Sequence, residues 1–236
     1  MVSNRLFICL LIASSYYLSA GYHSQYKQDQ YMNEWFFHNM RDGIFVDIGA
    51  HNGSTYSNSL FYEEDLGWKG ICVEPMPEVF AQLQQCRKAI CVQACITNTT
   101  GIKDFLRVTS PHIDTEMLSG LLDKYDPKHL QRVNHEIAHY GGKKEVIQVM
   151  CYTLNDLVKE YGLPYIDYLS IDTEGGELDI LKSINFDTLA IHIIDVENNF
   201  PNDASIRLFM ESKGFRFVAR VNCDEVYENM QWQPVN

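Results

Sequence analysis

The stretch 44–53, which reads IFVDIGAHNG, constrains the fold of this chain more than any other. Its first half, Ile44 to Ile48, is a short apolar run rich in β-branched residues, which is typical of a strand covered on both faces. Asp47 falls near the carboxyl end of that run, where open α/β sheets place their ligands. Gly49 and Gly53 permit backbone conformations that a Cβ atom would obstruct. The stretch therefore predicts a buried strand, a tight glycine turn and a helix that begins near residue 54.

A second acidic residue follows the next apolar run. Glu74 ends the run Gly70 to Val73 and lies about 20 residues after Gly53, the spacing of a carboxylate that binds a ribose in dinucleotide folds. Together with Asp47 it predicts a nucleoside-type cofactor on the first β-α-β unit. The competing interpretation is an ordinary strand-turn-helix with incidental glycines, and the position of Glu74 makes that interpretation less favoured.

The glycine pattern discriminates between cofactors. A dinucleotide motif G-x-G-x-x-G that starts at Gly49 would need glycine at positions 51 and 54, but these are His51 and Ser54. The missing second glycine normally lets the backbone approach a pyrophosphate, so NAD and FAD fit poorly. S-adenosylmethionine has no phosphate, and its sulfonium cation and ribose diol suit Asp47 and Glu74. The sequence therefore favours S-adenosylmethionine as the cofactor.

Four motifs together resemble a known family. The chain is similar to the FkbM-type methyltransferases, and within them to the Star-like branch, from Ser24 to Asn229. The motifs that carry the resemblance are Asp47-Ile48-Gly49-Ala50-His51-Asn52-Gly53, Gly67-Trp68-Lys69-Gly70, Glu74-Pro75 and Ile166-Asp167-Tyr168-Leu169-Ser170-Ile171-Asp172-Thr173-Glu174-Gly175. The resemblance implies a class I methyltransferase fold and O-methylation of a hydroxyl on a sugar or small metabolite. The Star-like branch also implies an alternative, a catalytically silent binding or trafficking protein on the same fold.

The order of apolar segments agrees with that fold. We expect an α/β, Rossmann-like domain over residues 21–236, with a seven-stranded, mostly parallel sheet, a final antiparallel strand and helices on both faces. The expected strands are 44–48, 70–74, 89–97, 165–171, 190–196, 215–221 and 226–228. The expected helices are 24–37, 55–64, 77–87, 153–161 with Thr153 as its cap, 178–183 and 205–214. Residues 98–150 form an excursion that we expect to help cover the substrate.

Acidic residues end several of the expected strands. Asp172, Glu174 and Glu197 are the predicted catalytic residues, because methyl transfer needs an aligned acceptor and a base that removes its proton. The resemblance adds Ala94 and Cys95, where this fold meets the adenine ring. The predicted cofactor-binding residues are Asp47, Gly49, Ala50, His51, Asn52, Gly53, Glu74, Pro75, Ala94, Cys95 and Asp172. A divalent metal held by Asp172, Glu174 and Glu197 is an alternative that we do not favour.

The net charge and the cysteine content limit which partners and metals the chain is expected to bind. The net charge of −12 and the lack of a Lys/Arg cluster argue against nucleic-acid binding. The family resemblance implies a small-molecule or glycan acceptor as the partner. The sequence does not indicate an oligomeric state. Seven cysteines occur without a C-x-x-C pair, which argues against a zinc site, and buried free thiols are the favoured interpretation. His135 and His139 lie one helical turn apart, a spacing that we assign to a solvated helix rather than to a metal site.

The N-terminus predicts a compartment. Arg5 precedes the apolar run Leu6 to Ala13, so residues 1–20 are interpreted as a secretory signal peptide, with no stable membrane span after its cleavage. The expected location is the secretory pathway or the exterior; the alternative is a cytoplasmic protein or one anchored by an uncleaved N-terminus. Two glycosylation sequons begin at Asn52 and Asn98, and we expect Asn52, on the cofactor loop, to stay unmodified.

Overall fold

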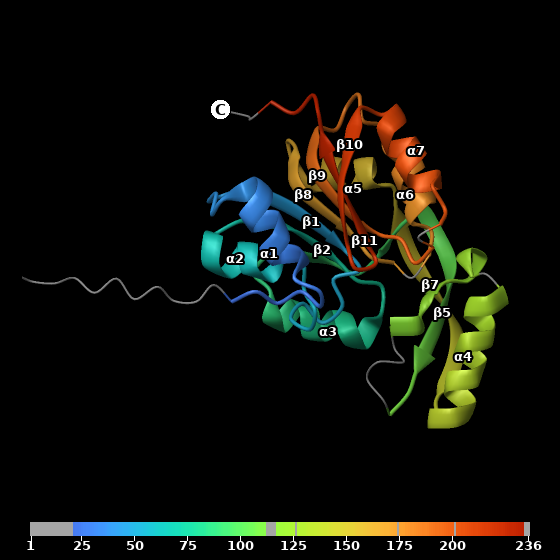
Figure 1. Ribbon diagram of the computed structural model, residues 1–236. Coiled ribbons are helices and arrows are strands. Elements are labelled where there is room, and N and C mark those ends of the chain that lie inside the picture. The colour runs from blue at the N-terminus through green and yellow to red at the C-terminus, as the bar shows by residue number, and fades with distance from the viewer. Residues whose placement is uncertain (1–20, 112–116, 126, 174, 201, 234–236) are drawn as a thin grey trace, which may run out of the picture.

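The computed structural model describes residues 21–111, 117–125, 127–173, 175–200 and 202–233. Within them the chain forms one seven-stranded sheet and one four-stranded sheet (Figure 1). The predicted signal peptide, residues 1–20, lies outside the described residues, so the predicted compartment stays a prediction. No helix in the described ranges is both long and apolar enough to cross a membrane.

The larger sheet has the strand order β10-β11-β9-β8-β1-β2-β3. Its members are β1 Ile44–Ile48, β2 Lys69–Val73, β3 Ile90–Val92, β8 Ile166–Ile171, β9 Ile191–Glu197, β10 Phe215–Val221 and β11 Asp224–Asn229. Neighbouring strands from β3 to β9 run parallel, and β11 alone runs antiparallel to both of its neighbours. The predicted fold class, a mostly parallel sheet of seven strands that closes with an antiparallel strand, is confirmed.

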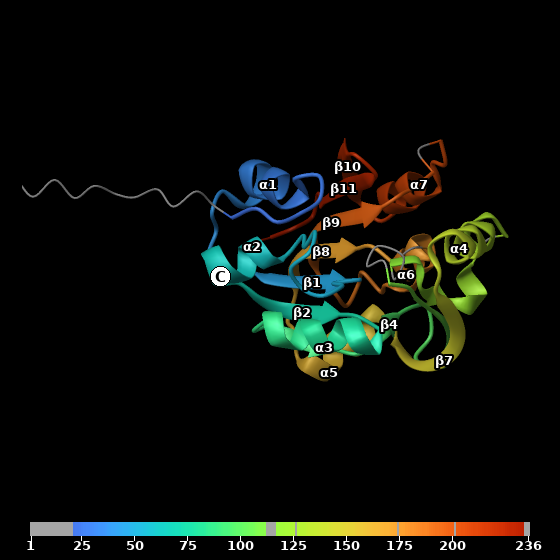
Figure 2. The same cartoon turned by 90° about the horizontal axis from the view of Figure 1, so that it is seen from below.

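Alternate residues of each central strand face two separate cores, as the period of two dictates. In β1, Val46 and Ile48 belong to the core under α5, α6 and α7, whereas Phe45 belongs to the core under α1, α2 and α3. Helices therefore cover both faces of the sheet (Figure 2). The helices are α1 Gln28–Met32, α2 Leu60–Leu66, α3 Pro77–Cys86, α5 Leu154–Tyr161, α6 Glu177–Ser183 and α7 Ser205–Ser212.

The helix expected at residues 55–64 begins later than predicted, at Leu60. Side chains in the preceding loop bond to backbone N–H groups that a helix would otherwise use: the Asn52 carboxamide accepts from Thr55, and the Ser57 hydroxyl accepts from Leu60 at 3.2 Å. Tyr56 also has a positive φ of 56°, which a helix does not allow. The segment after β1 is therefore a long polar loop rather than a helix start.

The third predicted strand, 89–97, is two strands that belong to different sheets. β3 ends at Val92 in the larger sheet, and β4, Cys95–Ile96, pairs in parallel with β7 of the smaller one. The N-terminal helix predicted at 24–37 is also shorter, because the Asp29 carboxylate accepts from the backbone N–H groups of His23 and Ser24 and holds them outside the helix. After α1, the chain continues as a π-helical turn, Asn33–Phe37.

The excursion at 98–150 builds the smaller sheet, whose order is β4-β7-β5-β6. Its further elements are β5 Gly101–Thr109, β6 Gly120–Leu121, a 3₁₀ turn Leu122–Lys124, α4 Pro127–Tyr140 and β7 Lys143–Tyr152. Val133 of α4 packs with Leu106, Val108 and Leu118 in a small core of its own. Both views place this sheet and α4 beyond the carboxyl ends of β1 and β2 (Figures 1 and 2).

Gly49 allows β1 and β8 to end close together. Its φ is +87°, and a Cβ atom built on it would lie 1.7 Å from the carbonyl oxygen of Asp172, which follows β8. The variant Gly49→Ala should therefore be destabilised by at least about 2 kcal/mol, because neither backbone can give way without disturbing the sheet. Urea unfolding of both proteins measures this difference.

A matched control separates the clash from the backbone conformation. Gly162 also has a positive φ, +69°, but an added Cβ atom there would have no atom within 4 Å. Gly162→Ala should cost only the conformational penalty of about 1–2 kcal/mol. Equal losses of stability in the two variants would contradict the importance of the close approach at Gly49.

Candidate functional site

A cavity of about 420 Å³ opens at the carboxyl ends of β1, β2 and β8, within the size range of small-molecule sites. It brings together nine of the predicted cofactor residues and one further predicted catalytic residue. These are Asp47, Gly49, Ala50, His51, Glu74, Pro75, Ala94, Cys95 and Asp172, with Glu197. Glu174 lies outside the described residues, so its catalytic role stays a prediction.

Asn52 and Gly53 do not line the cavity but shape the loop beside it. The Asn52 side chain accepts from the backbone of Thr55 at 2.8 Å and donates to its hydroxyl at 2.9 Å, so it is held within its own turn. Gly53 is buried, and a Cβ atom there would lie 2.7 Å from side-chain atoms of Leu83 and Arg87. This glycine makes room for a side chain rather than for a ligand.

Glu74 is a buried carboxyl group of the cavity wall. It is only 6% exposed, and burial raises its pKa to about 7. The backbone N–H groups of Met76 and His51 donate to the carboxyl and oppose the shift, whereas the charge of Asp47 adds to it. A buried carboxyl that changes protonation near neutral pH is a common feature of ligand and catalytic sites.

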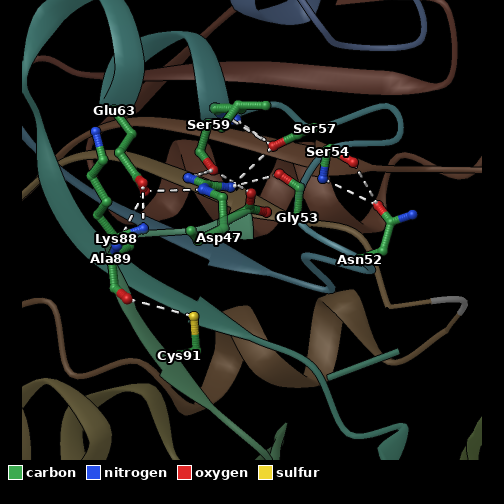
Figure 3. Close-up of polar contacts among 12 residues, drawn as sticks. Asp47, Asn52, Gly53, Ser54, Ser57, Ser59, Glu63, Lys88, Ala89 and Cys91 are labelled. Atoms are coloured by element: carbon green, nitrogen blue, oxygen red, sulfur yellow. Dashed lines mark hydrogen bonds and ion pairs between the residues drawn. The ribbon is translucent and has the colours of Figure 1, made fainter. Parts of the chain in front are cut away.

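Asp47, on the same wall, is 4% exposed and belongs to a hydrogen-bonded chain (Figure 3). Burial raises its pKa, while the nearby Arg87 and the hydroxyl of Ser59, which donates to Oδ2 at 2.5 Å, lower it. One Nη of Arg87 in turn donates to the Ser59 oxygen at 3.0 Å. Asp47 is therefore linked through one serine to a buried cation.

Arg87 connects the loop after β1 to α2 and α3. Its side chain is fully buried, and its Nε donates to Glu63 at 2.9 Å in an ion pair. Its other Nη donates to the carbonyl of Gly53 and the hydroxyl of Ser57. Sequence patterns did not indicate this group, because Arg87 occurs at the end of an amphipathic helix, where an arginine usually faces solvent.

The remaining wall of the cavity is apolar and comes from three elements. Its residues are Val73, Met76, Val79, Ala94, Cys95, Ile96 and Phe105. Met76, Val79, Cys95 and Phe105 share one core cluster, so α3 and the smaller sheet hold this wall in place. A flat aromatic group can lie against such a wall while its polar substituents reach Glu74.

A second cavity, about 940 Å³, adjoins the first. Gln25, Arg132, Gly175 and Glu197 line both, so the two spaces meet where β8 and β9 end. Asp172, which is exposed, lines the first cavity near this junction. Within the described parts of the chain, no three Asp, Glu, His or Cys side chains gather to hold a metal ion.

A comparison with known families decides the assignment. Residues 47–217, more than half of the chain, match the Methyltransferase FkbM domain. The chain belongs to the FkbM methyltransferase family. The matched region begins at Asp47 and includes Glu74, Asp172 and Glu197, so the walls of the first cavity come largely from the FkbM domain.

Individual relatives are distant. "Methyltransferase 1" of Beauveria bassiana is 22% identical over 187 residues, which cover 74% of this chain and 72% of that protein. The crystal structure of methyltransferase FkbM from Methylobacillus flagellatus is 11% identical with a TM-score of 0.41, and the match covers 80% of this chain but 44% of that one. Precorrin-6y C5,15-methyltransferase from Geobacter metallireducens is 14% identical with a TM-score of 0.40, over 80% of this chain and 79% of that one.

The buried ion pair of this FkbM domain should dominate the stability of the loop. Arg87→Met leaves the Glu63 carboxylate buried without its cation, which costs about 3–5 kcal/mol. The double variant Arg87→Met, Glu63→Leu should recover part of that loss, because both charges are then removed. Urea unfolding measures each difference.

The exposed pair Arg216–Glu228 supplies the control. The Arg216 side chain is 59% exposed, so Arg216→Met should cost less than about 1 kcal/mol. If Arg87→Met were no more costly than Arg216→Met, the buried network would not support the loop as described.

Proposed function

We propose that this protein is an S-adenosylmethionine-dependent methyltransferase that methylates a hydroxyl group on a sugar or small metabolite. The single observation that carries the proposal is the buried Glu74 carboxyl, which lines the same cavity as the Gly49 turn and Asp47. That combination of an acidic strand end, a glycine turn and a second buried carboxyl suits a nucleoside whose ribose diol needs an acceptor.

The residues of the first cavity fit the cofactor group by group. The ionised Glu74 can accept both ribose hydroxyls in charge-assisted hydrogen bonds, and the apolar wall around Ala94 and Cys95 can pack against adenine. S-adenosylmethionine supplies a methyl group on a sulfonium cation, and the excess of carboxylates in this cavity favours a cation. Asp47, Glu74, Asp172 and Glu197 line it, whereas Arg132 is its only described Lys or Arg residue.

The second cavity is the proposed acceptor site. It meets the first at Glu197, so an acceptor there would approach the transferred methyl group from the ends of β8 and β9. Asp172 and Glu197 are then placed to orient the acceptor hydroxyl and to take its proton. Glu177, by contrast, accepts from the Thr173 hydroxyl and the Gly175 N–H, which supports a role at the start of α6.

The charges of the second cavity favour an uncharged acceptor. Its wall carries five carboxylates, Asp123, Glu177, Asp179, Glu197 and Asp203, against two cations, Lys124 and Arg132. Lys124 pairs with Asp179 and Arg132 pairs with Glu136, so the positive charge of each is already partly neutralised by a carboxylate of the protein. Phe200, which is 60% exposed, offers an apolar face beside these polar groups. A neutral hydroxylated molecule suits this wall better than a phosphorylated or carboxylated one.

Replacement of Glu74 tests the cofactor site. At pH 8, Glu74→Gln should weaken S-adenosylmethionine binding by about 1.5–3 kcal/mol, because charge-assisted bonds to the ribose are lost. Since the pKa of Glu74 is about 7, the wild-type carboxyl is mostly protonated at pH 6 and must lose its proton to bind in the ionised form. The difference between the two proteins should therefore shrink at pH 6. Isothermal titration calorimetry at both pH values measures it.

The control is Glu78→Gln on α3, whose carboxyl pairs with Arg107 and does not line the cavity. It should bind like the wild type at both pH values. Unchanged affinity in Glu74→Gln would remove Glu74 from the cofactor site, and tight binding of NADH in place of S-adenosylmethionine would overturn the choice of cofactor.

Asp172 tests catalysis separately from binding. Asp172→Asn should lower kcat by about tenfold or more while the cofactor Kd changes little, as expected for a group that acts mainly in the transition state. The assay follows S-adenosylhomocysteine formation with an acceptor chosen by screening neutral sugars. Asp187→Asn, on an exposed loop outside both cavities, is the matched control. An Asp172→Asn enzyme with the wild-type rate would reject the catalytic role.

A further inference from the structure

Two cysteines lie opposite each other on neighbouring strands of the smaller sheet. Cys95 of β4 and Cys151 of β7 are direct partners in the parallel register of the smaller sheet. Paired residues on adjacent strands project to the same face, and their strands lie about 4.8 Å apart. That separation falls within the range of Cα–Cα distances, about 4.4–6.8 Å, that a disulfide bridges. Both residues are free thiols in this structure.

The two sulfur atoms differ in their access to small molecules. Cys95 is 8% exposed and lines the cofactor cavity, whereas Cys151 is fully buried behind it. Both belong to the core cluster that also contains Met76, Val79 and Phe105. A reagent can therefore reach Cys95 through the cavity, while Cys151 can react only with Cys95.

The two thiols interact with each other and differ in pKa. The contact with Cys95 lowers the pKa of Cys151, and Lys103 lowers it further against the effect of burial. The same contact, together with burial, raises the pKa of Cys95. Cys151 therefore ionises more readily than Cys95, which suits it to attack the mixed disulfide that Cys95 forms with a reagent.

We propose that Cys95 and Cys151 form a reversible disulfide in the wall of the cofactor cavity, made by exchange with a small disulfide that enters through that cavity. Cys95 loses its proton and attacks one sulfur of the oxidant, and the thiolate that leaves takes up a proton. Cys151 then loses a proton and attacks the Cys95 sulfur of the mixed disulfide, which releases the second thiolate. Two cysteine thiols lose two electrons and two protons, and the oxidant becomes two thiols.

The disulfide would lie in the wall of the cavity, where bond formation and ligand binding can affect each other. Ala94 and Ile96 flank Cys95 and line the same wall, so closing the bond to β7 acts on the surface against which a ligand packs. Thiol–disulfide exchange runs in both directions, so an excess of a small thiol reopens the bond.

Peptide mapping of the full-length protein tests the proposal. The reduced protein is exposed to 2-hydroxyethyl disulfide, remaining thiols are alkylated, and digested peptides are sequenced by mass spectrometry. The expected product joins the peptides that hold Cys95 and Cys151 and is lighter by two hydrogen atoms. In Cys151→Ser, Cys95 should stop at the mixed disulfide with the reagent. Cys91→Ser, in neighbouring β3, is the matched control and should still form the product.

Two results would overturn the proposal. One is a wild-type protein in which Cys95 and Cys151 both remain alkylated while the exposed Cys86 has reacted. The other is a cross-link that persists in Cys151→Ser. The wild-type map alone decides the first outcome, so the test does not depend on the folding of any variant.

A further arm rests on the proposed function. S-adenosylhomocysteine at ten times its Kd should slow the cross-linking about tenfold, because the ligand leaves only about a tenth of the protein open to the reagent. Cross-linking at an unchanged rate, with the ligand bound by calorimetry, would show that the ligand does not cover Cys95. That result would count against the cofactor assignment of the cavity and leave the disulfide itself intact.

Discussion

The site depends on a buried ion pair between Arg87 and Glu63. Arg87 donates hydrogen bonds to the loop after β1 at the carbonyl of Gly53 and the hydroxyl of Ser57. It also donates to the hydroxyl of Ser59, which in turn donates to Asp47. Glu63 receives the Nε of Arg87 and the backbone N–H of Lys88, and so fixes the turn between α3 and β3. The charge of Arg87 also opposes the rise in the pKa of Asp47 that burial causes. The same ion pair therefore stabilises the loop that shapes the cavity and influences the charge of the cavity wall.

Much of this architecture was predictable from local patterns in the sequence. The run Ile44 to Ile48 became β1 with the predicted bounds, because a β-branched run bounded by glycines has few alternatives. Thr153 caps α5 as expected, and its hydroxyl accepts from the N–H of Asp156. Residues that end parallel strands converge on one edge, which is why Asp47, Glu74 and Asp172 meet in one cavity although their roles remain proposals.

Long-range contacts overrode local preference at two of the wrongly predicted elements. The helix predicted from residue 55 was delayed because Ser57 and Asn52 bond to backbone N–H groups, and Ser57 is in turn held by Arg87. The predicted strand 89–97 divided because Cys95 pairs with Cys151, more than fifty residues later in the chain. The burial of Arg87 and the space that Gly53 leaves for its side chain could not be predicted locally, because both depend on how three separate segments pack together.

Native mass spectrometry of the protein, purified without denaturation and then mixed with equal amounts of S-adenosylmethionine and NADH, tests the proposed cofactor most directly. We expect a single added mass, that of S-adenosylmethionine or of S-adenosylhomocysteine already carried from the cell, because His51 occupies the place where a dinucleotide loop needs glycine. Binding of NADH alone, or of neither ligand, would contradict the central claim that the cavity above Glu74 is built for this cofactor.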